Sequence, residues 1–344
     1  MDKTLKLSDL KCGDVMLFEA PPEPLSQLIA KLTHSKVSHA GLSDYNPAYV
    51  LNEEIDGVVR APLHTNNERG IYIRRLTRKE GEDITYPDTK IVADIATKYA
   101  EEKLPYGKFN LAVLGLYILG YNFAEDSKYR DLILSVIKIA IFEVIKLVDK
   151  KYYDDPDVHP MVCSQFAAHC YDEAFKVKGL DYKIRYTEEV TSGQNLLKEI
   201  IDYIKEHIAD LFKKTPGMLL ETSENVAVNR DEKIMALLDK IKEDEAYNRV
   251  DKVSSVKSFI SEELIRMFYI YGRHLLKLSG NKKEYKDITK EDVSGQELLS
   301  LFNDLLLFQE TFITPEDLLS HTENLEDMGK LVYTPEEIEV YLKQ

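Results

Sequence analysis

The stretch that decides the fold is His159–Tyr171, with the sequence HPMVCSQFAAHCY. A helix that begins near Cys163 puts Phe166, Ala167 and Cys170 on one face, at the spacings of an amphipathic helix. Cys163 then stands at the helix N-terminus, where free N–H groups and the macrodipole stabilise a thiolate. Most free cysteines are buried packing residues, so this stretch alone leaves two interpretations open, a nucleophile and a core residue.

Composition limits the class of protein. A chain of 344 residues can bury one large core or two ordinary ones. Its 44% hydrophobic and 31% charged content is typical of a soluble globular protein. The net charge of -15 argues against a nucleic-acid partner, because phosphate binding needs basic surface.

The cysteines and the N-terminus indicate a compartment. The three cysteines, Cys12, Cys163 and Cys170, form no disulfide framework, and the odd count suits a reducing environment. Residues 1–10 carry charges throughout and lack the apolar run of a secretory signal. We therefore expect a cytoplasmic protein.

Short apolar runs fill the N-terminal part, and helical patterns fill the rest. The predicted strands are Val15–Phe18, Tyr49–Leu51, Gly57–Arg60, Ile71–Leu76 and Asp181–Tyr186. The predicted helices are Ser26–Leu32, Thr89–Lys103, Gln194–Lys213, Glu232–Glu245, Ser255–Ser279 and Gly295–Gln309. Since no helix separates the predicted strands between Tyr49 and Leu76, the sheet is expected to be antiparallel, in an α+β fold.

Residues 110–150 form the most apolar part of the chain. Leu111–Tyr121 is short and contains glycines, and Leu132–Val148 carries charges, so neither segment is expected to span a membrane. A buried helical hairpin is one interpretation. The other is a lid, an apolar wall for an acyl chain, or a peripheral membrane contact.

Two segments resemble each other, Thr215–Asn225 and Thr314–Asn324, and share the pattern Thr-Pro-x-x-Leu-Leu-x-x-(Ser/Thr)-Glu-Asn. Each Thr-Pro pair predicts a helix N-cap followed by proline in the first turn. One similarity of this length indicates a reused capping element and not a repeat protein.

Several motifs in order carry a resemblance to a known family. They are Cys12–Phe18, Thr33–Ser35, Val37–Leu42 around His39, Tyr49–Leu51, Gly57–Leu63, Leu104–Tyr106 and Val162–Phe166 around Cys163. Together they resemble the circularly permuted NlpC-type papain-like cysteine hydrolases of the YaeF/YiiX kind, over about residues 5–185. In that family the histidine strand precedes the cysteine helix.

The resemblance implies a permuted papain-like domain over 1–215, with an antiparallel sheet packed on helices and an apolar helical insertion at 110–150. A helical C-terminal region, 216–344, follows. The Thr-Pro-x-x-Leu-Leu element resembles the segment that closes such domains, so both copies are candidates for that role, the second within 314–331. The insertion departs from the family pattern.

The resemblance also implies the catalytic residues. Cys163 is the expected nucleophile and His39 the expected base, while a third polar residue orients the imidazole. The family usually has a glutamate directly after the Tyr-Val-aliphatic strand, where this chain has Asn52, followed by Glu53 and Glu54. Strand alternation puts Asn52 and Glu54 on one face and Glu53 on the other, and all three candidates stay open.

The oxyanion is expected to be held by the backbone N–H of Cys163 and the hydroxyl of Tyr106, a role that the resemblance suggests. No cofactor is expected. A zinc site built from His159, Cys163, His169 and Cys170 is disfavoured, because these side chains leave opposite faces of the helix.

The leading hypothesis is a cysteine peptidase or amidase that works through a thioester. One alternative keeps these residues but makes the protein a lipid acyltransferase or thioesterase, with 110–150 as the acyl wall. Another is a catalytically idle fold whose C-terminal helices bind a protein partner.

Overall fold

The fold is taken from a computed structural model. It describes residues 3–22, 26–27, 30, 35–54, 57–63, 69–80, 83–102, 163–187, 192–207, 262–278, 283–288, 291–306 and 313–343. The chain divides into two units: 1–107, 160–191 and 313–344 make the first, and 108–159 with 192–312 make the second. The expected boundary was at 215, whereas residues 192–215 group with the second unit. Residues 313–344, which include the expected closing segment 314–331, group with the first unit.

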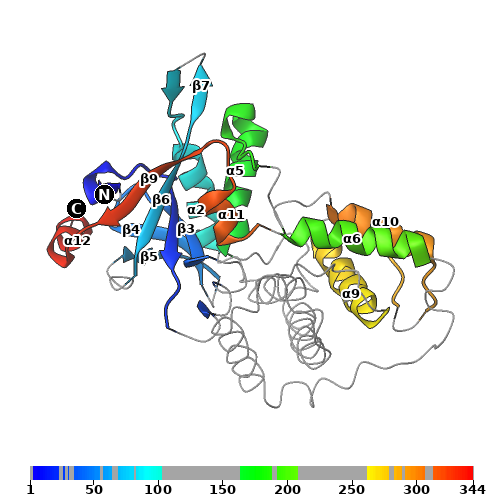
Figure 1. Cartoon of the computed structure of the whole chain (residues 1–344). Coiled ribbons are helices and arrows are strands. Elements are labelled where there is room, and N and C mark those ends of the chain that lie inside the picture. The colour runs from blue at the N-terminus through cyan, green and yellow to red at the C-terminus, as the bar shows by residue number, and fades with distance from the viewer. Residues whose placement is uncertain are drawn as a thin grey trace, which may run out of the picture. The chain divides into compact units, whose positions relative to one another are not determined.

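The first unit is built on a sheet of seven strands among the described residues, in the order β1-β9-β6-β2-β3-β4-β5 (Figure 1). Their bounds are β1 (Thr4–Lys6), β2 (Val15–Glu19), β3 (Val37–Ser43), β4 (Tyr49–Glu54), β5 (Gly57–Pro62), β6 (Ile71–Leu76) and β9 (Leu325–Val332). A separate hairpin joins β7 (Arg78–Glu80) to β8 (Asp83–Thr85).

The sheet is mixed, which corrects the expected antiparallel arrangement. All neighbours are antiparallel except β1 and β9, which run parallel. The exception arises because β9 comes from the far end of the chain and enters between β1 and β6. The class, α+β, is as predicted.

One face of the sheet is covered by helices. They are α2 (Lys90–Glu102), α5 (Cys163–Lys178) and α11 (Pro315–Ser320), and they lie together on one side of the strands in Figure 1. The rings of Tyr99 on α2 and Phe166 on α5 meet edge to face, with centroids 6.5 Å apart. This contact buries the apolar faces of both helices against each other.

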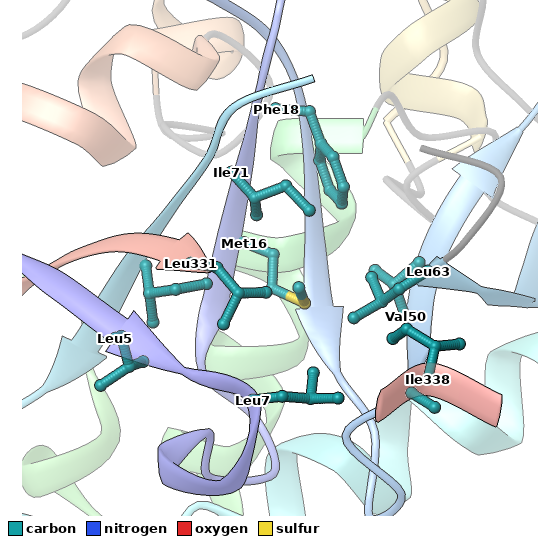
Figure 2. Close-up of a cluster of buried hydrophobic side chains, with 11 residues drawn as sticks. Leu5, Leu7, Met16, Phe18, Val50, Leu63, Ile71, Leu331 and Ile338 are labelled. Atoms are coloured by element: carbon teal, nitrogen blue, oxygen red, sulfur yellow. The ribbon is translucent and has the colours of Figure 1, made fainter. Parts of the chain in front are cut away.

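The other face carries a compact apolar cluster (Figure 2). Its side chains come from β1, β2, β4, β6 and β9, from the loops before β4 and after β5, from η1 (Leu7–Asp9) and from α12 (Pro335–Leu342). The buried members are Leu5, Leu7, Met16, Phe18, Ala48, Val50, Leu63, Ile71, Ile73, Leu331 and Ile338. The sheet therefore has a core on each side.

The C-terminal segment contains two helices with the same type of start. The Thr314 hydroxyl accepts from the Asp317 N–H, and an Asp317 carboxylate oxygen accepts from the Thr314 N–H at 2.8 Å. Thr334 and Glu337 form the same capping box at the start of α12. The predicted cap at Thr314 is confirmed, whereas the matching segment Thr215–Asn225 lies outside the described residues.

The second unit is helical where it is described. It contains α6 (Ser192–His207), α9 (Glu262–Leu278) and α10 (Gly295–Leu306). A side chain at Gly272 of α9 would meet Leu305 of α10 at 2.4 Å, so the glycine allows these helices to approach closely. None of the described helices combines the length and apolar composition that a bilayer crossing requires.

Three of the predicted segments differ from the structure or lie outside its described part. Asp181–Tyr186 is not a strand: the segment holds η3 (Leu180–Tyr182) and a single bridge from Tyr186 to Thr322. The helix predicted at Glu232–Glu245 and the apolar stretch 110–150 lie outside the described residues.

Candidate active site

Cys163 is the first residue of α5, and its side chain is fully buried. The prediction that this cysteine begins a helix is confirmed. The first turn of a helix has N–H groups without intrahelical acceptors, and the macrodipole adds a partial positive charge there. The position suits a group that becomes an anion.

The direction of α5 puts Cys163 toward the start of β3. The Tyr171 hydroxyl donates to the carbonyl of Gly13 at 2.7 Å, and the Gly13 N–H donates to the carbonyl of Ser43, the last residue of β3. After α5 the chain stays near the segment before α2, because the Tyr182 hydroxyl donates to the carbonyl of Asp88.

The lengths of the two elements agree with this direction. Cys163 lies about 12 Å back along the helix from Tyr171. His39 lies about 13 Å back along β3 from Ser43. If α5 runs alongside β3, these similar lengths put the thiol and the imidazole at the same end of the strand.

His39 is half-buried in β3 and lies against Phe18, with ring centroids 5.5 Å apart. Burial lowers the pKa of His39 to about 4, and the positive charge of Arg69 adds to this effect. The imidazole is consequently neutral at pH 7, and in this buried state it is a weaker base than an exposed histidine.

Asn52 lies in β4 directly opposite Gly41 of β3 and is 2% exposed. Its side-chain oxygen is buried and has no hydrogen-bond partner within the described part of the chain. A buried acceptor without a donor costs roughly 1–3 kcal/mol, so it needs an explanation. Gly41 makes room for the amide, because a Cβ there would lie 3.1 Å from the Asn52 Cβ.

The pairing register shows which side chains share a face, since directly opposed residues in an antiparallel ladder point the same way. His39 is opposite Phe18, while Met16, Gly41 and Asn52 are aligned across three strands. These residues share one face, that of the cluster in Figure 2. His39 and Asn52 are diagonal neighbours on it, about 7 Å apart at Cβ, within reach of their side chains.

The helix that carries Cys163 covers the other face. Leu17, Ala40, Leu42 and Leu51 alternate with the residues above, are fully buried, and belong to the face on which α5 and α11 pack. None of the described side chains of α5 belongs to the cluster in Figure 2.

The position of α11 gives a second argument. Burial lowers the pKa of Arg74, and the carboxylates of Asp327 and then Glu316 on α11 act against this shift. Arg74 is opposite Val15 in the ladder, on the same face as Leu17. The Ser164 hydroxyl donates to the carbonyl of Ile313, just before α11, so the start of α5 is also on that face. The structure thus brings His39 and Asn52 together and places Cys163 across the sheet from them.

A β-bulge lies beside His39. Phe18 pairs with His39 but the next residue, Glu19, pairs with Val37, so Ser38 has no partner in the ladder. The Ser38 hydroxyl is buried and is without a hydrogen-bond partner among the described residues. Bulges reorient neighbouring side chains and occur often next to active sites.

The other predicted site residues are less well defined. The backbones of Glu53 and Glu54 belong to β4, opposite Val58 and Gly57, and their side chains are not described. Tyr106 and His159 lie outside the described residues. No group of three or more His, Cys, Asp or Glu residues suited to a metal occurs in the described part of the chain.

His169 belongs to a polar cluster that the sequence analysis did not identify. Its Nε2 lies 3.3 Å from both the Tyr99 hydroxyl and the Glu173 carboxylate. The hydrogen bond from His169 lowers the pKa of Glu173 to about 2. The i, i+4 spacing of His169 and Glu173 is the signal in the sequence that indicates this pair.

Comparison with known proteins gives no relative: no family model, curated protein or solved structure matches the chain.

Proposed function

We propose that the protein is a cysteine hydrolase with a permuted papain-like, NlpC-type fold, and that it cleaves a peptide or amide through a thioester on Cys163. The observation that carries the proposal is the buried oxygen of Asn52, which has no hydrogen-bond partner among the described residues and lies on the same face as His39. An imidazole N–H is the donor that this oxygen lacks. Asn52, more than Glu53 or Glu54, is therefore the proposed orienting residue.

The proposed reaction has two steps. His39 takes the proton from the Cys163 thiol, and the sulfur attacks the substrate carbonyl carbon. His39 then gives the proton to the leaving amine as the C–N bond breaks, which leaves an acyl thioester on Cys163. In the second step His39 takes a proton from water as the water oxygen attacks the thioester carbonyl; the C–S bond then breaks, the acid leaves, and His39 returns the proton to the Cys163 sulfur.

Asn52 is the proposed acceptor of an N–H from the resting imidazole, and this bond sets the tautomer of His39 before the ring turns. The backbone N–H of Cys163 and the Tyr106 hydroxyl are the proposed oxyanion donors.

The reaction requires His39 and Cys163 to meet on one side of β3. The bulge at Ser38 is the proposed place of this change, because Ser38 makes no ladder pair and its hydroxyl has no hydrogen-bond partner among the described residues. A shift of pairing by one residue moves a side chain to the other face of a strand. We propose that substrate binding moves the bulge to His39 and turns its ring from the face of Asn52 and Phe18 toward α5, so that Asn52 holds the imidazole only before this change.

A second candidate is a catalytically idle fold that acts as an interaction module. The placement of His39 and Cys163 on opposite faces favours it. The lipid acyltransferase alternative depends on residues 110–150, which the structure does not describe.

A thiol-reactive peptidyl probe separates the two candidates. The hydrolase should be labelled at Cys163, and full-length Cys163→Ala should not be labelled. Labelling only at Cys12 or Cys170 contradicts the hydrolase and leaves the idle fold.

A further inference from the structure

The second residue of α5 makes a long-range bond. Ser164 is fully buried, and its hydroxyl donates to the backbone carbonyl of Ile313 at 2.6 Å, across 149 residues of sequence. A hydroxyl in the first turn of a helix more often accepts from a free N–H of that turn. Here it connects the turn that carries Cys163 to the C-terminal segment.

The acceptor is itself held firmly. Residue 313 directly precedes the capping box of α11, in which Thr314 and Asp317 exchange hydrogen bonds at 2.8 and 3.0 Å. Both residues are 4% exposed, so water does not compete for these bonds. α11 also contacts β2 and β3, the strands that carry Phe18 and His39. The carbonyl of Ile313 is therefore fixed relative to the strand of the proposed base.

We propose that Ser164 is a positioning residue, which holds the first turn of α5 against Ile313 so that Cys163 stays at a fixed place relative to β3. Its catalytic consequence rests on the proposed hydrolase function. A nucleophile must be held within about 0.5 Å of its productive position, and a buried bond from the adjacent residue provides that restraint. The proposal makes the C-terminal segment part of the catalytic unit.

The test compares Ser164→Ala, Ser164→Thr and a control, Ile338→Val, in the full-length protein. Ile338 is buried in the cluster on the opposite face, so the control loses comparable stability without touching α5. Two rates are measured by peptide mapping across pH 5 to 9: alkylation of Cys163 by iodoacetamide, and its acylation by peptidyl esters.

Ser164→Ala should slow acylation about tenfold or more and move the pH profile of Cys163 alkylation. Ser164→Thr keeps the hydroxyl and should restore most of the acylation rate and of the pH profile of alkylation. Ile338→Val should match the wild type in both measurements.

Each contrary result is informative. The positioning role is overturned if Ser164→Ala leaves both rates and the pH profile unchanged. It is also overturned if Ile338→Val changes them equally, or if iodoacetamide never modifies Cys163 in the wild-type protein. If Cys163 is alkylated with a profile that Ser164→Ala moves, but no ester acylates it, the hydrolase fails and the positioning role stands.

Discussion

The ring of His39 packs against the ring of Phe18, with centroids 5.5 Å apart, because the two residues are directly opposite in the β2–β3 ladder. This contact keeps the imidazole on the face of Asn52 as long as the bulge stays at Ser38. It also helps to bury the imidazole, and burial lowers the pKa of His39 so that the ring is neutral at pH 7. The predictions below follow from this arrangement and from the buried oxygens of Ser38 and Asn52, which have no hydrogen-bond partner among the described residues.

His39 should make stability depend on pH. Its pKa is lowered by burial to about 4, below the roughly 6.5 of an unfolded histidine. The unfolded chain therefore binds the proton first, so this contribution is fully present above about pH 6.5 and is lost as pH falls toward 4. The loss should reach at most about 3 kcal/mol. Urea unfolding at pH 4 and pH 7 measures the difference in the free energy of unfolding. His39→Gln should remove the part of that difference that His39 contributes. An equal pH dependence in the variant contradicts the lowered pKa of His39.

Two buried serines should respond oppositely to the same substitution. Ser38→Ala removes a hydroxyl that has no described partner and should raise the free energy of unfolding by about 1 kcal/mol. Ser164→Ala leaves the Ile313 carbonyl without its donor and should lower the free energy by about 1–2 kcal/mol. Chemical denaturation of both variants checks the pair. Changes of the same sign would show that the hydroxyl at residue 38 is satisfied in solution.

Asn52→Leu should separate stability from activity. The substitution keeps the side-chain size and removes an oxygen that has no described donor, so the free energy of unfolding should change by less than about 1 kcal/mol. Ester hydrolysis should fall about 100-fold or more, because the imidazole tautomer is no longer fixed. Retained turnover in a folded Asn52→Leu protein would transfer the orienting role to Glu53 or Glu54.

Gly41→Ala should disturb the packing between β3 and β4. The added Cβ would lie 2.7 Å from the Val50 Cγ2 and 3.1 Å from the Asn52 Cβ, closer than packed atoms tolerate. We expect a loss of about 1–3 kcal/mol in the free energy of unfolding. Thermal unfolding measures the change, and an unchanged midpoint would mean that β4 moves away without cost.

Local patterns predicted the local elements well. Alternation and turn residues located β2, β4, β5 and β6, and helical spacing located α2, α5, α9 and α10 to within a few residues in most cases. The Thr-Pro pattern identified the cap at Thr314 because a capping box is formed by residues three apart.

Long-range relationships could not be predicted in the same way. β9 pairs with β1 across more than 300 residues, and no local pattern specifies that partner or its parallel direction. The hydrogen bond from Ser164 to Ile313 also joins residues far apart in the sequence, so no local pattern predicts it. The opposite placement of His39 and Cys163 depends on the ladder register and on which face α5 covers, and neither is encoded in the spacing of the two motifs.

The most direct test of the central claim is intact-mass spectrometry after incubation with a panel of peptidyl and acyl esters, followed by peptide mapping. We predict a thioester adduct on Cys163 in the wild-type protein and none in His39→Ala or Cys163→Ala. An adduct that forms equally in His39→Ala, or that is found only on Cys12 or Cys170, would contradict the claim that Cys163 and His39 act together.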